Sequence, residues 1–420
     1  MNAIFTIVAK NYLPQARTLG DSIKKLSPDM PFHIILVDEV NGAPDLGAEK
    51  YEVTQFKNMG FPFWRDMAYK YNVIEFSTAV KPFVFDYLFK NRNYEKIIYL
   101  DPDIYVYRDL KPVFDELENN FAVLTPHIAN MEVDFTGMVT QELILSSGIY
   151  NLGFLALKRD QRVQALLEWW MKRLQFKGYI DKSDALFVDQ KWMDFLPAFF
   201  DDGIRIQRNA GYNVALWNLH ERSLRIQGES YFIEEKYGEK RLVPLMFFHF
   251  SGFDPNNPKI IHKRHPEFNR DSYPEFKGLL EDYSKAILGN RYNEDSKLSY
   301  AYTRYENGMS ITGFQRRLYR GVTEEGFRYD DPFSVLPGSF YEVLKKNGLL
   351  VKDKSGILDA LSMKNYPGAD KKIKLLLFLM GILKKIVGIK LYSLLLMFLG
   401  RFSRPEKQIF LIKGMKMQTK

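Results

Sequence analysis

The sequence predicts an α/β protein with a mainly parallel sheet, and three observations support this prediction. Apolar runs of strand length alternate with longer segments of helical periodicity from residue 3 to residue 248. Such alternation is typical of a parallel sheet covered by helices. Acidic residues directly follow two of the expected strands, at Asp38 and Asp101, and ligands bind such sheets at the carboxyl ends of the strands. Finally, 420 residues exceed one ordinary hydrophobic core, so we expect two or three domains.

The first expected strand covers residues 3–9 and leads into a helix over 11–26. Pro14 lies near the first turn of this helix, and apolar residues follow at helical spacing. A second strand over 32–37 ends at Asp38.

Thr78 is expected to cap a helix over 79–89, which leads into a strand at 97–100. The remaining expected elements are strands at 104–106, 121–124 and 243–248, and helices at 161–174 and 185–195.

The pattern changes along the chain, and we expect three domains. Residues 1–268 carry the alternating pattern, residues 269–368 are a polar helical extension, and residues 369–420 are a basic, apolar helical tail.

Composition excludes several classes of protein. A hydrophobic share of 46% and a charged share of 26% are typical of a globular chain. The absence of cysteine excludes disulfide frameworks, thiolate metal sites and cysteine nucleophiles, and it fits the cytoplasm. The N-terminal MNAIFTIVAKNY has too short an apolar run and no charged leader for a signal peptide, so we expect a cytoplasmic protein.

Positive charge is concentrated in the tail. Residues 371–420 contain twelve Lys or Arg and one acidic residue, a net +11, whereas the whole chain carries +8. Residues 1–370 therefore carry a net −3, and we expect no nucleic-acid partner. Segment 371–400 is the most apolar of the chain, but its uninterrupted apolar runs reach only about ten residues, half of a spanning helix. We expect a helix or helix pair on an anionic membrane surface; packing on the body or a dimer interface is the alternative.

Two carboxylates separate two apolar runs, at Asp101-Pro102-Asp103. Two carboxylates separated by one residue at the end of a buried strand raise the free energy of the fold unless a positive charge lies between them. Mg²⁺ and related cations use one or two carboxylates together with substrate phosphates, so the pair is a candidate metal site. A solvated turn is the alternative, because Asp and Pro are ordinary turn residues.

Three further segments add candidate residues. Asn151 and Gly153 open an expected strand, where Asn can bind sugar hydroxyls and Gly allows close backbone approach; a tight turn is the alternative. Asp189 and Gln190 lie side by side in an expected amphipathic helix, where capping or a surface position would also explain them. His249 ends an apolar strand. It is either a buried histidine with ordinary hydrogen-bond partners or a third metal ligand, and two carboxylates with one imidazole suit Mn²⁺.

Lys81 lies in the first turn of an expected helix. A cation there opposes the helix dipole, which suggests a bound anion; a flexible surface lysine is the alternative.

The order of these motifs resembles that of the metal-dependent glycosyltransferases of the GT-A fold, particularly the family 8-like group, and of bacterial surface-polysaccharide glycosyltransferases. The resemblance spans roughly residues 3–265 and implies that residues 1–268 are a nucleotide-sugar-binding catalytic domain. It implies that Asp101 and Asp103 bind Mn²⁺ (or Mg²⁺) and the donor diphosphate, with His249 as the third metal ligand.

One departure concerns the segment after His249-Phe250-Ser251-Gly252. The Lys-Pro-Trp of the family is Phe253-Asp254-Pro255 here. A basic residue that binds the β-phosphate must therefore come from elsewhere, such as Lys259, Lys263 or Arg264.

The resemblance also implies which residues bind the donor, taken as a UDP-sugar. The turn around Ala9, Asn11 and Tyr12 would contact the base and ribose together with Asp38, and Lys81 would bind donor phosphate.

Asn151 and Asp189 would hold sugar hydroxyls. If the reaction inverts the anomeric centre, Asp189 is the expected general base. If it retains configuration, as the family 8 resemblance implies, Gln190 or Asn151 would line the face opposite the leaving group. A basic, membrane-facing tail suits an acceptor carried on a lipid diphosphate, as in capsule or O-antigen assembly at the inner face of the cell membrane.

Two other functions are alternatives. A haloacid-dehalogenase-type phosphohydrolase also carries D-x-D after an apolar strand, but it needs Thr or Val two residues after the second Asp, and Val106 is one residue too far. A scaffold that binds nucleotide sugar without turnover is the non-enzymatic alternative.

Overall fold

The structure, a computed structural model, describes residues 1–40, 46–263, 265, 271–350 and 369–414. The chain forms two compact units: Met1–Phe61 with Val73–Tyr300, called the sheet unit, and Pro62–Asn72 with Ala301–Lys420, called the helical unit. The expected boundaries at 268/269 and 368/369 fall at the gaps 266–270 and 351–368, outside the described residues. The three-domain division therefore stays a prediction.

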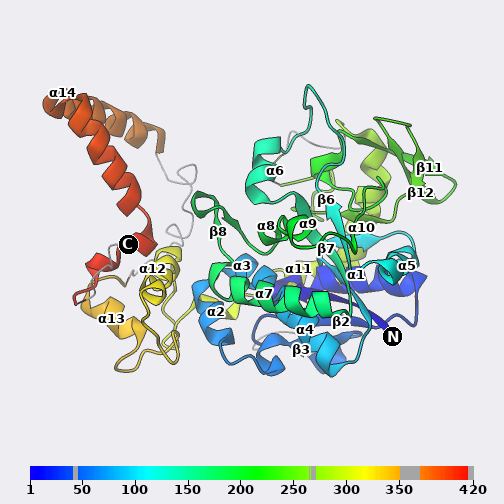
Figure 1. The fold of residues 1–420 in the computed structure, drawn as a ribbon, viewed down its shortest axis with the longest axis horizontal. Coiled ribbons are helices and arrows are strands. Elements are labelled where there is room, and N and C mark those ends of the chain that lie inside the picture. Colours follow the sequence, from blue (N-terminus) through cyan, green and yellow to red (C-terminus); the bar gives the residue numbers. More distant parts are fainter. Residues whose placement is uncertain (41–45, 264, 266–270, 351–368, 415–420) are drawn as a thin grey trace. The chain divides into compact units, whose positions relative to one another are not determined.

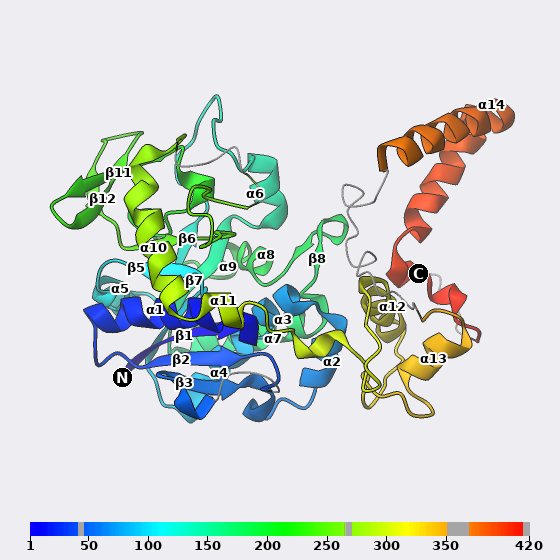
Figure 2. The same ribbon diagram turned by 180° about the vertical axis from the view of Figure 1, so that it is seen from behind.

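A seven-stranded sheet is the centre of the sheet unit (Figures 1 and 2). β7 runs antiparallel to both of its neighbours, and the other neighbouring strands run parallel. This arrangement, with the helical C-terminal region described below, confirms the expected fold class. In spatial order the strands are β10 (Ile204–Ile206), β6 (Ala122–Pro126), β7 (Tyr150–Lys158), β4 (Lys96–Leu100), β1 (Asn2–Val8), β2 (Phe32–Leu36) and β3 (Glu52–Gln55).

Helices cover both faces of this sheet. Ile4 of β1 and Ile98 of β4 share one buried cluster with α1 (Leu13–Leu26) and α5 (Lys111–Asn119). Phe5 faces the other way, and its ring lies 4.8 Å from that of Phe85 in α4 (Lys81–Asn91). Figures 1 and 2 show α4 and α7 (Gln161–Lys177) together on this second face. The central strands are continuous apolar runs because both of their faces are buried.

Smaller sheets and short helices complete the structure. β5 (Ile104–Val106) pairs with β14 (Phe247–His249), and β11 (Arg222–Gln227), β12 (Ser230–Glu235) and β13 (Leu242–Pro244) form an antiparallel sheet. β8 (Ile180–Asp181) pairs with β9 (Leu186–Phe187). The other α-helices are α2 (Trp64–Lys70), α3 (Val73–Ala79), α6 (Gln141–Ser147), α8 (Gln190–Met193), α9 (Leu196–Phe199), α10 (Lys277–Gly289), α11 (Tyr292–Asp295), α12 (Gly313–Glu324), α13 (Phe340–Lys346) and α14 (Ala369–Phe402).

Two expected helices differ from the structure. Thr78 does not cap α4: it lies in α3, where its hydroxyl donates to the carbonyls of Ile74 and Glu75, and Val80 precedes α4 without a side-chain cap. The expected helix over 185–195 is instead strand β9 followed by the one-turn helix α8. Ala185 and Val188 adopt positive φ angles of 55° and 40°, which a continuous helix does not allow.

The expected strand over 243–248 is two strands. Its first residues belong to β13 and its last to β14, and these strands lie in different sheets. Between them, Leu245 donates its backbone N–H to Tyr231 and Met246 donates to Gly211. The chain therefore changes sheets just before it reaches His249.

Residues 271–300 belong to the sheet unit and pack on α1. Arg17 of α1 pairs with Asp295 of α11 at 2.6 Å, and Asn290 donates to Thr18 and Asp21 of α1. Helices α10 and α11 therefore cover α1.

Buried hydrogen bonds hold the helical unit together. The guanidinium of Arg316 in α12 donates to the carbonyls of Ala68, Tyr69 and Tyr71, which explains why residues 62–72 belong to this unit. Glu406 is also buried, and it pairs with Arg320 of α12.

Helix α14 is bent and exposes many apolar side chains. Gly388 takes φ 75° and ψ 161°, which divides α14 into two helical arms (Figure 1). Leu377, Phe378 and Ile386 are 64%, 64% and 75% exposed. Within the described ranges, no helix has both the length and the apolar character that crossing a membrane requires.

Candidate active site

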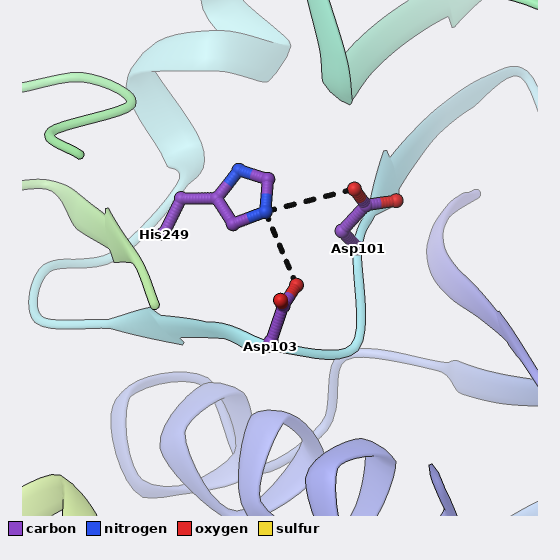
Figure 3. A group of neighbouring side chains, drawn as sticks. All are labelled: Asp101, Asp103 and His249. Atoms are coloured by element: carbon purple, nitrogen blue, oxygen red, sulfur yellow. Dashed lines mark ion pairs between the residues drawn. The ribbon is translucent and has the colours of Figure 1, made fainter. Parts of the chain in front are cut away.

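Asp101, Asp103 and His249 come together at the carboxyl end of β4 (Figure 3). The Nε2 atom of His249 lies 3.1 Å from Oδ1 of Asp103 and 3.7 Å from Oδ2 of Asp101. The side chains of Asp101 and Asp103 keep 29% and 22% exposure, whereas that of His249 keeps 5%. The structure therefore brings these three side chains together, and their role as metal ligands stays a prediction.

Backbone pairing explains how residues 146 positions apart in the sequence meet. Asp101 follows β4 and donates its N–H to the carbonyl of Gly153 in β7 at 2.8 Å. β5 begins right after Asp103 and pairs antiparallel with β14, which places His249 opposite Ile104. Just beyond β14, the N–H of Phe250 donates to the carbonyl of Asp103 at 2.8 Å.

These donor atoms suit a hard or borderline divalent cation. With metal–ligand bonds of about 2.1 Å, neighbouring octahedral ligands lie about 3.0 Å apart. The ligand atoms of the three residues all lie within 4.8 Å of one another, and two carboxylates with one imidazole form a mixed N/O set that suits Mn²⁺. The partial exposure of both aspartates leaves the site open to a ligand from solvent.

Burial and charge oppose each other in this cluster. Burial raises the pKa of Asp101 and outweighs the attraction of Lys81 and His249, which acts to lower it. Burial acts to lower the pKa of His249, but Asp103 and Asp101 together raise it above its ordinary value. The two aspartates therefore favour the charged form of the His249 ring.

Gly153 makes room for the His249 ring. A Cβ atom on Gly153 would lie 2.5 Å from Cε1 of His249 and 2.8 Å from the Oδ1 atom of Asn151, closer than such contacts allow. The sequence predicted close approach of a ligand to this glycine, whereas the structure places a protein side chain there.

Lys81 and Asp189 form a buried ion pair beside the metal cluster. The ammonium donates to a carboxylate oxygen of Asp189 and to the carbonyl of Leu152, the latter at 2.6 Å, and it lies 4.0 Å from the ring centre of Tyr99. Burial raises the pKa of Asp189, and Lys81 opposes that rise. The anion that the position of Lys81 predicted is thus, in this structure, the side chain of Asp189.

Asn151 belongs to a buried polar network. Its Oδ1 atom accepts from the N–H of Gly153 at 3.1 Å and from Asn213 at 3.2 Å. Its Nδ2 atom contacts Nε2 of His127 at 3.3 Å, and Nδ1 of His127 contacts the carbonyl of Ile149. Burial lowers the pKa of His127 to about 4, so the ring is neutral, donates from Nδ1 and accepts at Nε2. These bonds fix the orientation of the Asn151 amide.

Gln190 follows Asp189 at the start of α8. Its amide donates to the carbonyl of Ser147 at 3.0 Å, and the indole of Trp170 donates to the carbonyl of Asp189 at 3.2 Å. These bonds anchor the pair in a short turn, which differs from the expected place inside a long helix.

The residues expected to bind the nucleotide lie at the ends of β1 and β2. Ala9 and Asn11 follow β1, and Tyr12 is 45% exposed. Asp38 is buried; it accepts from the backbone N–H of Lys10 at 3.3 Å and pairs with the Lys10 ammonium at 3.7 Å. Because β4, β1 and β2 are parallel neighbours, these residues lie at the same edge of the sheet as Asp101. Of the basic residues that are candidates for phosphate binding, Lys259 and Lys263 are exposed, and Arg264 lies outside the described residues.

Sequence reasoning missed three residues near the cluster: His127, Asn213 and Tyr283. The first two orient Asn151 from loops that have no periodic pattern. Tyr283 of α10 stacks on Phe250 with ring centres 3.7 Å apart; burial, with smaller effects of Asp103 and Tyr12, raises its pKa. An isolated Tyr on a helix gives no sequence signal for such a position.

No protein-family model matches the chain. Two curated proteins of Bacillus subtilis (strain 168) are similar in sequence. The uncharacterised protein YfnF is 25% identical over 285 residues, which cover 62% of this chain and 86% of YfnF. The uncharacterised protein YfnD is 22% identical over 253 residues, which cover 59% of this chain and 76% of YfnD.

Solved structures that resemble the chain include three glycosyltransferases. The galactosyltransferase LgtC, in complex with donor and acceptor sugar analogues, is 18% identical with a TM-score of 0.39, covering 68% of this chain and 100% of LgtC. The bifunctional glycosyltransferase WbbM is 14% identical with a TM-score of 0.38, covering 69% and 51%. GlyE of Streptococcus pneumoniae TIGR4 is 14% identical with a TM-score of 0.37, covering 72% and 66%.

Proposed function

We propose that the chain is a metal-dependent glycosyltransferase of the GT-A type. It would move a sugar from a nucleotide diphosphate donor, a UDP-sugar, to a hydroxyl of a glycan acceptor. The observation that carries this proposal is the convergence of Asp101, Asp103 and His249 at a partly exposed strand end. Asp101 and Asp103 come from one turn and His249 from a distant strand, so the fold, and not local sequence, assembles the set.

The three residues would hold Mn²⁺ (or Mg²⁺). When bound, the ion supplies Lewis-acid stabilisation of the charge that develops on the leaving nucleoside diphosphate. Ala9, Asn11, Tyr12 and Asp38 would bind the base and ribose, because they lie on the neighbouring strand ends of the same sheet edge.

The sugar would lie between this cluster and Asn151, Asp189 and Gln190. The Oδ1 atom of Asn151 already accepts two hydrogen bonds, so a sugar contact would use its amide nitrogen. Lys81 is a positioning residue that holds the Asp189 carboxylate and opposes its protonation. Asp189 is the proposed base if the reaction inverts configuration, and Gln190 or Asn151 lines the rear face if it retains configuration.

The phosphohydrolase alternative is not favoured. Asp101 follows β4, which is an internal strand preceded by β1, β2 and β3 in the chain, and not the first strand of its domain. In addition, His249 approaches both aspartates, which suits a metal ligand better than it suits an aspartate nucleophile.

We further propose that α14 attaches the protein to an anionic membrane surface. The helix combines exposed apolar side chains with six lysines within residues 371–400. Such a helix lies in the interface when apolar burial and attraction to anionic headgroups add up. The acceptor would then be a lipid-linked glycan of a bacterial capsule, O-antigen or other cell-surface polysaccharide. The protein would be peripheral at the cytoplasmic face of the cell membrane.

A donor-hydrolysis assay tests the enzymatic proposal. The full chain is incubated with a panel of nucleotide sugars and Mn²⁺ or EDTA, and thermal shifts are recorded in parallel. We expect one UDP-sugar to raise the melting temperature of the protein and to be hydrolysed, and we expect both effects with Mn²⁺ but not with EDTA. D103N should reduce hydrolysis by about 100-fold or more, because several kcal/mol of Lewis-acid stabilisation are lost. D115N, an exposed aspartate of α5, is the matched control and should behave like wild type. Equal hydrolysis in EDTA, or phosphate release from simple phosphomonoesters, contradicts the proposal.

A further inference from the structure

A second cluster of candidate metal ligands lies outside the motifs discussed so far. It consists of Glu132, in the loop between β6 and α6, and of His220 and Glu221, which directly precede β11. One ligand atom from each residue lies within 4.8 Å of the others. The side chains are 5%, 5% and 2% exposed, so this is a buried group and not a solvated acidic patch.

The distances match those between ligands of one ion. Nε2 of His220 lies 3.2 Å from Oε1 of Glu132 and 3.7 Å from Oε1 of Glu221. With zinc bonds of about 2.0–2.1 Å, neighbouring tetrahedral ligands lie about 3.3 Å apart. The observed separations lie on either side of this value.

Polar atoms that face this cluster lack hydrogen bonds. Among the residues that the structure describes, neither ring nitrogen of His220 has a hydrogen-bond partner, and Oε1 of Glu132 has none either. Buried polar atoms in native proteins are nearly always paired. The His220 ring and the Glu132 carboxylate are close, but they form no hydrogen bond with each other. In a simple buried ion pair, such a hydrogen bond would be expected.

The remaining carboxylate atoms are held in place by a second layer of donors. Glu221 accepts from the backbone N–H of Ala129 at 3.0 and 3.1 Å and from the Asn130 amide at 2.7 Å. Thr136 donates its N–H and its hydroxyl to the Oε2 atom of Glu132, each at 3.2 Å, which leaves Oε1 directed at His220. Outer partners of this kind orient the ligands of protein metal sites.

Two cations lie near the cluster and act on it through their charge, Arg222 on Glu221 and His220, and Lys236 on His220. The guanidinium of Arg222 donates to the carbonyl of Tyr212, and the ammonium of Lys236 donates to the carbonyl of Leu219. Both therefore bind backbone oxygens in the structure.

We propose that Glu132, His220 and Glu221 form a second site for a divalent transition metal of the zinc class, separate from the Asp101–Asp103–His249 cluster. The ion is structural: it joins the loop around Glu132 to the start of β11. Trp217, three residues before His220, packs its ring 5.1 Å from that of His249 and 5.3 Å from that of His127. The second ion would therefore stiffen the wall of the candidate active site without taking part in its chemistry.

Metal stoichiometry of the purified full chain tests the proposal. The protein is equilibrated with Zn²⁺, freed from unbound metal by gel filtration, and analysed by elemental mass spectrometry. All variants are made in a D103N/H249Q background, which removes the first cluster. We expect one equivalent of Zn²⁺ in the background protein and none after adding H220Q. E142Q, an exposed glutamate of the nearby helix α6, is the control and should retain one equivalent.

Co²⁺ substitution gives a second readout. The background protein should show the visible absorption of a low-symmetry Co²⁺ site, and H220Q should lose it. If H220Q does not fold by circular dichroism, E132Q gives the same test, because Glu132 lies in a loop. Equal Zn²⁺ content with and without H220Q or E132Q, or no bound metal in the background protein, overturns the proposal. Sugar transfer plays no part in these readouts, so failure of the proposed function would leave their outcome unchanged.

Discussion

The ammonium of Lys81 donates a hydrogen bond to the carboxylate of Asp189, although 108 positions separate the two residues in the sequence. Their side chains are 1% and 3% exposed. The pair joins α4 to the segment that leads into α8, next to the aspartates at the end of β4. Burying two charged groups costs desolvation free energy, so removing one partner would leave the charge of the other buried and uncompensated.

Breaking this pair should destabilise the protein strongly. K81M leaves a buried carboxylate without a partner, and such changes cost about 3–5 kcal/mol of unfolding free energy. K90M is the matched control in the same helix: Lys90 is 57% exposed and pairs with Asp86, so its loss should cost less than about 1 kcal/mol. Urea denaturation measures both, and the double variant K81M/D189L should recover most of the loss. Equal stability of K81M and K90M would contradict the structural role of the pair.

G153A should weaken metal binding at the first cluster. The added Cβ would lie 2.5 Å from the His249 ring, which would have to move away from Asp101 and Asp103. Overpacking of this kind costs about 1–3 kcal/mol of stability. We expect the Mn²⁺-induced thermal shift of the wild type to shrink or vanish in G153A. G289A is the control, since a Cβ there meets no atom within 4 Å; a normal Mn²⁺ shift in both variants would count against the geometry.

Acid should destabilise the protein through His127. The folded pKa of this group is lowered to about 4 from an ordinary value near 6.5, so its stabilising contribution is complete above pH 6.5 and is lost as the pH falls through 4. The shift corresponds to about 3 kcal/mol between pH 7 and pH 4. H127Q keeps an acceptor for Asn151 but does not titrate, so its free energy of unfolding should fall less over this range. Parallel pH profiles of wild type and H127Q would rule out this assignment.

The sequence was a good guide where local patterns determine structure. Apolar runs located β1, β2, β4 and β6, and the position of Asp101 at a strand end followed from the apolar run that stops just before it. The convergence of His249 on Asp101 and Asp103 came from the resemblance of motif order, because no local pattern states that β14 pairs with β5.

Long-range contacts and backbone strain were not predictable from the sequence. The partner of Lys81 comes from a segment 108 positions away, and Asn213 and His127 reach Asn151 from irregular loops. The apolar periodicity of 185–195 suggested a helix, but the positive φ of Val188 interrupts it, and tertiary contacts such as the bond from Trp170 to Asp189 fix the turn.

Membrane attachment through α14 should depend on its exposed apolar side chains. Deleting the whole tail would also remove Glu406, which is buried against α12, so substitutions are the sharper test. The triple variant L377Q/F378Q/I386Q should bind vesicles that contain phosphatidylglycerol at least about tenfold more weakly than wild type, because less apolar area enters the interface. I74Q/I226Q/L336Q removes three other exposed apolar side chains and serves as the control. Co-sedimentation measures binding, which should also weaken at high salt. If both triple variants bind as the wild type does, α14 is not the membrane anchor.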